Sequence, residues 1–107
     1  MISSIIWTDF AMQNLKQIFD YFAFKANRKI AHKIRNEILY STRNLINHPK
    51  SGQIELLLKD FQFEYRYIIC GNYKVIYRIA EEEIIITDIF DVRQNPSKIN
   101  NENRLKN

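Results

Sequence analysis

The segment FEYRYIICGNYKVIYRIAEEEIIITDIFDVRQNP, residues 63–96, decides the fold of this chain. Runs rich in Ile, Val, Tyr and Phe cover residues 63–70, 73–79 and 84–90, and such residues favour strands. Gly71-Asn72 is a typical two-residue hairpin turn, and residues 80–83 turn the chain a second time. The segment therefore predicts three antiparallel strands joined by tight turns.

The residues before this segment predict one strand and two helices. Residues 2–7 are apolar and β-prone, and Thr8 or Asp9 can cap a helix that continues to about residue 25. A second helix is predicted over residues 27–47, ended by Pro49 and Gly52. Both helices carry apolar residues at helical spacing, at Ala11, Leu15, Ile18, Phe19 and Phe22, and at Ala31, Ile34, Ile38 and Leu45. Residues 53–59 form either a strand or a loop leading into one.

These elements predict an α+β fold in the order β-α-α-β-β-β, with a helical hairpin packed on one face of a small antiparallel sheet. If Gly71-Asn72 and Glu81-Glu82 are both two-residue loops, the strand pairing also fixes the faces. The face toward the helices is then expected to hold Ile68, Cys70, Val75, Tyr77, Ile79, Ile84, Ile86 and Phe90. The open face is expected to hold Tyr65, Tyr67, Lys74, Arg78 and Thr87, with Asp91 and Arg93 beyond the last strand.

Basic side chains interleaved with aromatic ones are what a surface needs to hold a phosphate backbone and to stack bases. The alternative is a half-buried sheet with a solvated basic rim. Arg66 falls on the helix-facing side near its edge, where a structural ion pair is expected. The basic run from residue 25 to residue 35 is either a solvated helix face or a surface that docks a partner or faces phosphate.

Composition adds further expectations. The chain has 107 residues, which is one domain, and a net charge of +4, which favours a nucleic-acid or acidic protein partner. Its single cysteine cannot form an intrachain disulfide, and no signal peptide or apolar run long enough for a membrane span is present, so a cytoplasmic protein is expected. His32 and His48 lack metal-ligand spacing, and no nucleophile motif or phosphate-binding loop occurs, so no cofactor is expected.

In order and spacing, the chain from about Ile5 to Ile99 resembles the RelE/ParE superfamily of toxins from bacterial type II toxin–antitoxin systems. The residues that carry the resemblance are Trp7, Ala11, Leu15, Ile18, Tyr21, His48, Pro49, Gly52, Arg66, the strand YKVIY at 73–77 and the segment IFDVRQNP at 89–96. The resemblance implies a toxin domain over residues 1–99 followed by a polar tail over residues 100–107. It also implies a growth inhibitor neutralised by a cognate antitoxin, which lays an extended or helical segment across the toxin.

Two toxic activities occur on this fold. RelE-like members cut messenger RNA in the ribosomal A site, whereas ParE-like members poison DNA gyrase. In the RelE-like case the resemblance makes Lys74, Arg78 and Arg93 the catalytic group, and Tyr65, Arg66, Tyr67 and Gln94 the contacts to nucleic acid or target. Lys74 stands where many relatives have Arg, and the C-terminal Tyr of RelE-like members has no clear counterpart. Because the set of RelE-like catalytic residues is incomplete, the resemblance favours the ParE-like branch. The alternatives are a ribosome-dependent endoribonuclease and a non-toxic module that only binds its antitoxin, so the sequence leaves open whether the chain is an enzyme.

Overall fold

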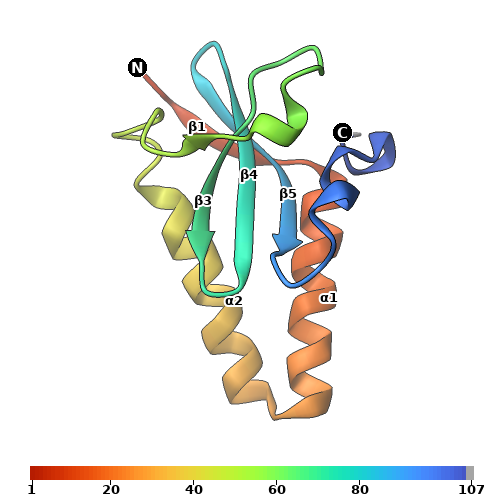
Figure 1. The fold of residues 1–107 in the computed structure, drawn as a ribbon. Coiled ribbons are helices and arrows are strands. Elements are labelled where there is room, and N and C mark those ends of the chain that lie inside the picture. The colour runs from red at the N-terminus through yellow and green to blue at the C-terminus, as the bar shows by residue number, and fades with distance from the viewer. Residues whose placement is uncertain (106–107) are drawn as a thin grey trace.

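The computed structural model describes residues 1–105, so positions 106 and 107 of the expected tail lie outside the described residues. The main elements are β1 (Ser4–Trp7), α1 (Asp9–Lys25), α2 (Arg28–Arg43), β2 (Gln53–Ile54), β3 (Arg66–Cys70), β4 (Tyr73–Ala80) and β5 (Glu83–Asp91). Short 3-10 helices cover Leu56–Leu58, Pro96–Asn100 and Glu102–Leu105. The sheet order is β1-β5-β4-β3-β2, in which β1 runs parallel to β5 and the other neighbours are antiparallel (Figure 1). The predicted α+β class is confirmed.

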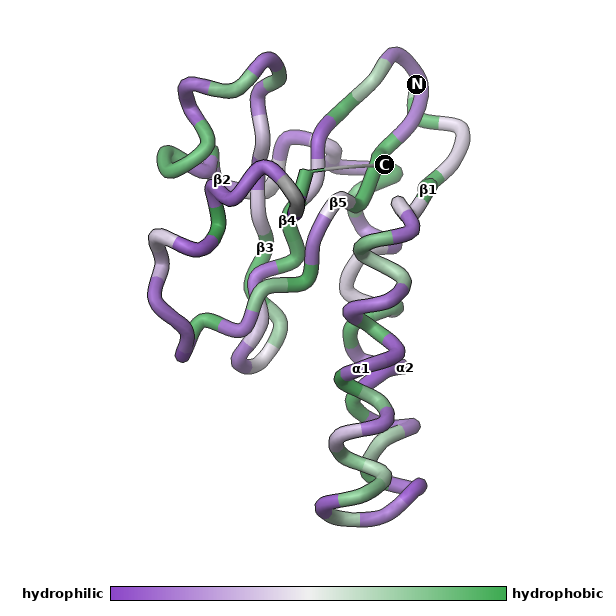
Figure 2. The backbone as a smooth tube through the Cα atoms, turned by 90° about the vertical axis from the view of Figure 1, so that its right-hand side faces the viewer, coloured by the Kyte–Doolittle hydropathy of each residue, from purple (hydrophilic) through white to green (hydrophobic). Residues whose placement is uncertain are grey.

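Side-chain caps fix where both helices begin. The Thr8 hydroxyl accepts a hydrogen bond from the amide of Ala11 at 3.1 Å, and the Asn27 amide oxygen accepts one from the amide of Ile30 at 2.9 Å. The second helix ends at Arg43 rather than at the predicted Asn47, because the amide of Leu45 bonds to the carbonyl of Thr42 and so tightens the chain into turns. The two helices run side by side and project beyond the end of the sheet (Figures 1 and 2).

The predicted hairpin turns and their register are confirmed. Cys70 pairs with Tyr73 across Gly71-Asn72, and Ala80 pairs with Glu83 across Glu81-Glu82. Gly71 and Glu81 both take left-handed backbone conformations, with φ of 59° and 55°, as two-residue hairpin loops require. The strand β3 begins at Arg66, later than the predicted residue 63. Both alternatives for residues 53–59 are partly realised, as a two-residue strand followed by a 3-10 helix.

A β-bulge at Thr87 changes which side chains of β5 face the helices, so part of that prediction is corrected. Tyr77 pairs with Ile86, but Ile76 pairs with Asp88, which leaves Thr87 as an extra, buried residue. The side-chain alternation of β5 is therefore reversed beyond this point. Ile89, and not Phe90, packs toward the helices, while Phe90 joins the opposite face. The placement of Phe90 toward the helices and of Asp91 and Arg93 on the open face was wrong, and Thr87 is buried within the bulge.

Hydrophobic cores occupy both faces of the sheet. The first joins the sheet to α1 and α2 through residues that include Ala11, Ile38, Val75, Tyr77 and Ile86. The second consists of Leu58, Tyr65, Ile76, Phe90 and Ile99. Ile99 is 1% exposed and belongs to the second core, so the segment after Pro96 covers this face of the sheet. No helix within residues 1–105 is long and apolar enough to cross a membrane.

Candidate functional site

The sheet face predicted to be open is partly closed by the second core. Tyr65 is 6% exposed, and burial raises the pKa of its phenol, although the nearby charge of Arg78 works in the opposite direction. Its ring is therefore unavailable for stacking on a base in this conformation. Tyr67 remains half-buried, and its hydroxyl donates to the Gln53 side-chain oxygen at 3.0 Å.

Lys74 is engaged within the fold. Its ammonium lies 2.8 Å from a carboxylate oxygen of Glu55, whose side chain is 4% exposed. The same ammonium lies 4.2 Å from the centre of the Tyr67 ring. A buried carboxylate at ion-pair distance neutralises the charge that a phosphate contact would need.

Arg78 stacks on Phe63, with its guanidinium carbon 4.0 Å from the ring centre. It forms no ion pair within residues 1–105. On the sheet face that holds Lys74 and Arg78, Lys74 is therefore paired with an acid, whereas Arg78 has no acidic partner within residues 1–105.

Arg66 serves the fold, as the sequence predicted. One of its guanidinium nitrogens donates to the carbonyl of Gly52 at 2.9 Å, and another lies 3.1 Å from the Glu64 carboxylate. The neighbouring Tyr77 hydroxyl donates to the carbonyl of Pro49 at 2.7 Å and accepts from the amide of Gly52 at 3.0 Å. These contacts fasten the chain between α2 and β2 to the sheet.

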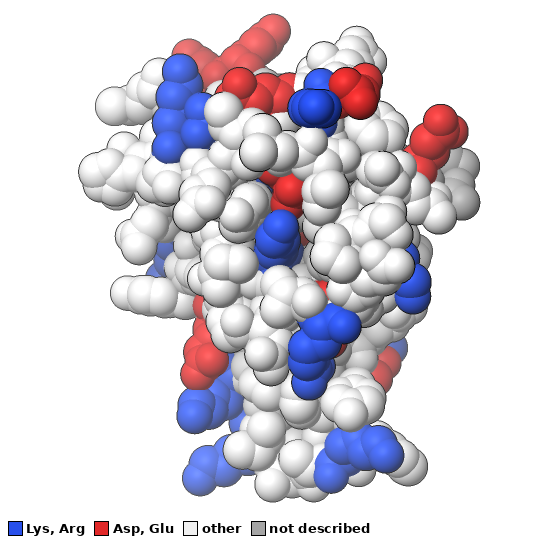
Figure 3. All heavy atoms as spheres, in the orientation of Figure 1, with Lys and Arg blue, Asp and Glu red and all other residues white. Residues whose placement is uncertain are grey.

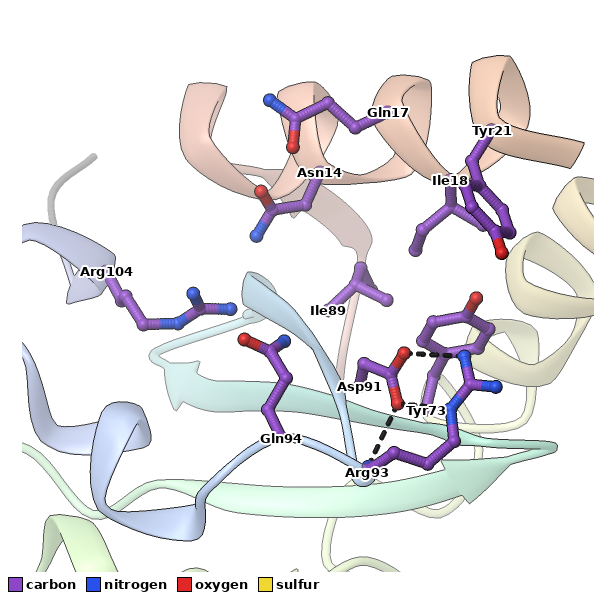
Figure 4. Close-up of a pocket in the computed structure, with 10 residues that line it drawn as sticks. All are labelled: Asn14, Gln17, Ile18, Tyr21, Tyr73, Ile89, Asp91, Arg93, Gln94 and Arg104. Atoms are coloured by element: carbon purple, nitrogen blue, oxygen red, sulfur yellow. Dashed lines mark hydrogen bonds and ion pairs between the residues drawn. The ribbon is translucent and has the colours of Figure 1, made fainter. Parts of the chain in front are cut away.

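Arg93 and Gln94 lie in a polar pocket of about 440 Å³ between α1 and the end of β5 (Figure 4). Arg93 pairs with Asp91 at 2.7 Å, and the hydrogen bond from its side chain lowers the pKa of that carboxyl. The remaining lining residues are Asn14, Gln17, Ile18, Tyr21, Tyr73, Ile89 and Arg104. Because Tyr73 and Ile89 belong to the helix-facing core, this pocket is on the opposite side of the sheet from Lys74 and Arg78. The predicted catalytic group is not brought together.

An apolar groove that the sequence pattern did not predict runs along the helical hairpin. The groove has a volume of about 630 Å³, and its apolar lining comes from Trp7, Met12, Leu15, Phe19 and Leu39. Met12 is 57% exposed, so the lining is open to a partner. Met12 and Leu39 lie outside the apolar stripes assigned to the core, which is the signal that could have revealed the groove.

Two arginines that form no ion pair within residues 1–105 border this groove. The Phe19 ring lies between them, 5.5 Å from the guanidinium carbon of Arg28 and 5.0 Å from that of Arg35. Arg35 also donates to a ring nitrogen of His32 at 2.9 Å, but its buried Nε has no hydrogen-bond partner among the residues that the structure describes. The remaining rim charges, Lys16 and Asp20, pair with each other. The groove therefore combines apolar surface with unpaired positive charge.

Comparison with known proteins decides between the branches of the superfamily. Residues 5–96 match the family described as the ParE toxin of the type II toxin–antitoxin system parDE. The chain belongs to the ParE toxin family. The predicted toxin of a type II toxin–antitoxin system, closer to the ParE-like branch, is thereby confirmed.

Among solved structures, a chain of the "Chromosomal ParDE TA system from P. aeruginosa" has a TM-score of 0.70 at 21% sequence identity. The match covers 86% of this chain and 97% of that one, and it shows that the two share the ParE fold. Comparison with curated protein sequences gave no match. Within the part of the chain that the structure describes, no group of three His, Cys, Asp or Glu side chains is placed to hold a metal ion.

Proposed function

We propose that this ParE toxin poisons DNA gyrase in the cytoplasm and is held inactive by a cognate antitoxin. Family membership supports the choice of gyrase, since the ParE-like branch of the superfamily acts on it. The observation that carries the choice is the ion pair between Lys74 and Glu55, which occupies the lysine that a ribonuclease of this fold would use.

A RelE-like nuclease needs several cations converging on one phosphate. Lys74 is paired, Arg78 is stacked on Phe63, and Arg93 is on the other side of the sheet. Without convergence, neither positioning nor charge stabilisation of a cleaved RNA is provided. A gyrase poison needs only a binding surface and is compatible with this arrangement.

The hairpin groove is the surface that we assign to the antitoxin. An amphipathic segment can bury its apolar side chains against Met12 and Leu39. An acidic residue on the same segment would pair with Arg28 and Arg35, which form no ion pair in the described part of the toxin.

The purified toxin tests the target directly. We expect it to inhibit supercoiling by gyrase and to accumulate cleaved DNA, while brief expression in cells produces chromosomal breaks and leaves messenger RNA intact. Uninhibited gyrase at toxin excess, with codon-phased RNA cuts in cells, would establish the nuclease instead. In that case Arg78→Gln and Arg93→Gln should abolish the cuts. Harmless expression without any antitoxin would indicate a binding module that has lost its toxicity.

A further inference from the structure

The outer face of α2 carries a row of exposed side chains that neither core uses. Lys29, Lys33, Tyr40 and Arg43 are spaced by four, seven and three residues, so they lie in one line along the helix. All four are exposed, and Tyr40 has an exposed fraction of 67%. We refer to these four residues as the α2 stripe.

The α2 stripe carries three positive charges, and the exposed carboxylate of Glu37, which lies in the same row between Lys33 and Tyr40, reduces the net charge of the row to +2. Lys29, Lys33 and Arg43 form no ion pair within residues 1–105. Arg43 instead lies over Tyr40, with its guanidinium carbon 5.4 Å from the ring centre. Figure 3 shows that Lys and Arg dominate the projecting end of the hairpin, whereas most of the acidic atoms visible on that face are at the opposite end.

The shape of the hairpin makes the stripe accessible to a large partner. The helices extend past the sheet, so the end of α2 that begins at Arg28 stands clear of the strands, whereas the end at Arg43 runs beside β3 (Figure 1). From Lys29 to Arg43 it is about 21 Å long at the rise of an α-helix. Duplex DNA places about six phosphates of each strand within that length. The phosphates of one strand can contact Lys29 and Lys33, which lie one turn apart, and the hydroxyl of Tyr40 can donate to a phosphate oxygen.

We propose that the α2 stripe binds the phosphate backbone of duplex DNA without reading its sequence. The choice of DNA over other polyanions rests on the proposed function, because gyrase acts on DNA. The stripe then holds the toxin on the DNA segment that gyrase has bound, while the groove of the hairpin, on another side of α2, receives the antitoxin.

Direct binding tests this inference. The probe is a fluorescent duplex of about 20 base pairs, which is long enough to span the stripe, and anisotropy is followed over a salt series. Lys29→Gln/Lys33→Gln should weaken binding and make the slope of log affinity against log salt shallower by about 2, or about 1 per lysine. Lys59→Gln/Lys98→Gln is the matched control, because it removes the same charge from exposed positions outside α2. Thermal unfolding of both variants checks that they remain folded.

Three outcomes would overturn the inference. These are no binding by the wild-type toxin at low salt, the same slope for both double variants, and competition by polyglutamate as effective as competition by unlabelled DNA of equal charge. Gyrase inhibition is measured separately on the same proteins. A wild-type toxin that binds DNA through the stripe and leaves gyrase fully active supports the stripe and overturns only the proposed target.

Discussion

The ammonium of Lys74 lies 2.8 Å from the Glu55 carboxylate, and the two side chains differ in burial, with exposed fractions of 20% and 4%. Glu55 also accepts a hydrogen bond from the amide of Leu57 at 3.2 Å. The pair therefore connects the 3-10 helix Leu56–Leu58 to the middle of the sheet. This ion pair stabilises the fold at the position where a nuclease of this fold would have a free cation.

Removing either partner should destabilise the toxin, and by different amounts. Lys74→Met leaves the more deeply buried Glu55 without a partner, so we expect a loss of about 2–4 kcal/mol in the free energy of unfolding. Glu55→Gln leaves Lys74, which can reach water, and should cost less. Urea denaturation of both variants and of the double variant gives the coupling between them. A double variant as unstable as the sum of the two would show that the pair does not interact.

Gly52 has no room for a side chain. A Cβ at this position would lie 2.6 Å from the hydroxyl oxygen of Tyr77 and 2.8 Å from the backbone carbonyl oxygen of Tyr67. Gly52→Ala should therefore cost about 2–4 kcal/mol, from overpacking and from loss of the bond between its amide and Tyr77. Gly71→Ala is the control, because nothing lies within 4 Å of its Cβ, and only its left-handed backbone opposes the change, at a cost of about 1–2 kcal/mol. Equal losses for the two variants in chemical denaturation would contradict this reading of Gly52.

The register of β3, β4 and β5 could be predicted because each turn contains two residues and one face of each strand is strongly apolar. The bulge at Thr87 could not. Its hydroxyl donates to the carbonyl of Ile76, and its own carbonyl accepts from the hydroxyl of Thr8, which is 79 residues earlier. These contacts exist only after the strands and α1 have packed, so the local pattern of β5 gives no sign that Phe90 changes face.

The candidate site was predictable in part for a similar reason. Lys74 could be assigned to its face from strand alternation, but its partner Glu55 comes from a segment whose path the sequence left open. Arg93 follows the bulge, so the error in facing moved it to the wrong side of the sheet. The hairpin groove depends on which apolar residues the helices leave uncovered, and this is decided by their packing on the sheet.

Alkaline titration should distinguish the buried phenols. Burial raises the pKa of Tyr65, Tyr73 and Tyr77 above the ordinary value of 10.0. Because their folded-state pKa values are raised, the neutral phenols stabilise the fold fully below pH 10. This stabilisation is lost as the pH rises through the folded-state pKa values. Phenolate absorbance should show a late phase, and unfolding should become easier over the same pH range. Tyr77→Phe should reduce the amplitude of that phase, and an unchanged amplitude would show that Tyr77 does not contribute to it.

The hairpin groove gives a prediction for neutralisation by the antitoxin. Met12→Glu places a negative charge on the apolar lining while changing a side chain that is 57% exposed, so the fold should tolerate it. We expect binding of the cognate antitoxin to weaken by at least tenfold, which corresponds to about 1.4 kcal/mol, with toxicity retained. Calorimetry with the antitoxin measures the loss. Ser97→Glu introduces the same charge at an exposed position outside the groove, and equal weakening by this control would argue against the groove as the docking surface.

Arg104 fastens the C-terminal segment to a buried carboxylate. Its guanidinium donates to both oxygens of Asp88, at 2.8 and 2.9 Å, and the Asn14 side chain donates to the same carboxylate at 2.9 Å. Asp88 is 1% exposed, and burial raises its pKa even though Arg104 and Asn14 act to lower it. Arg104→Met should leave an unpaired buried charge and cost about 2–4 kcal/mol at neutral pH.

The pH dependence of that loss identifies its cause. With a raised folded-state pKa, the favourable contribution of protonated Asp88 is fully present below its ordinary value of 3.8 and is lost as the pH rises through the folded-state pKa. The difference in stability between the wild type and Arg104→Met should therefore shrink as the pH falls through the folded-state pKa of Asp88, because the neutral acid no longer requires the arginine. Urea denaturation at a series of pH values measures it. A difference that stays constant over this range would assign the loss to the packing of Arg104 on Phe10 and Phe90, which its guanidinium carbon approaches to 5.2 and 5.0 Å.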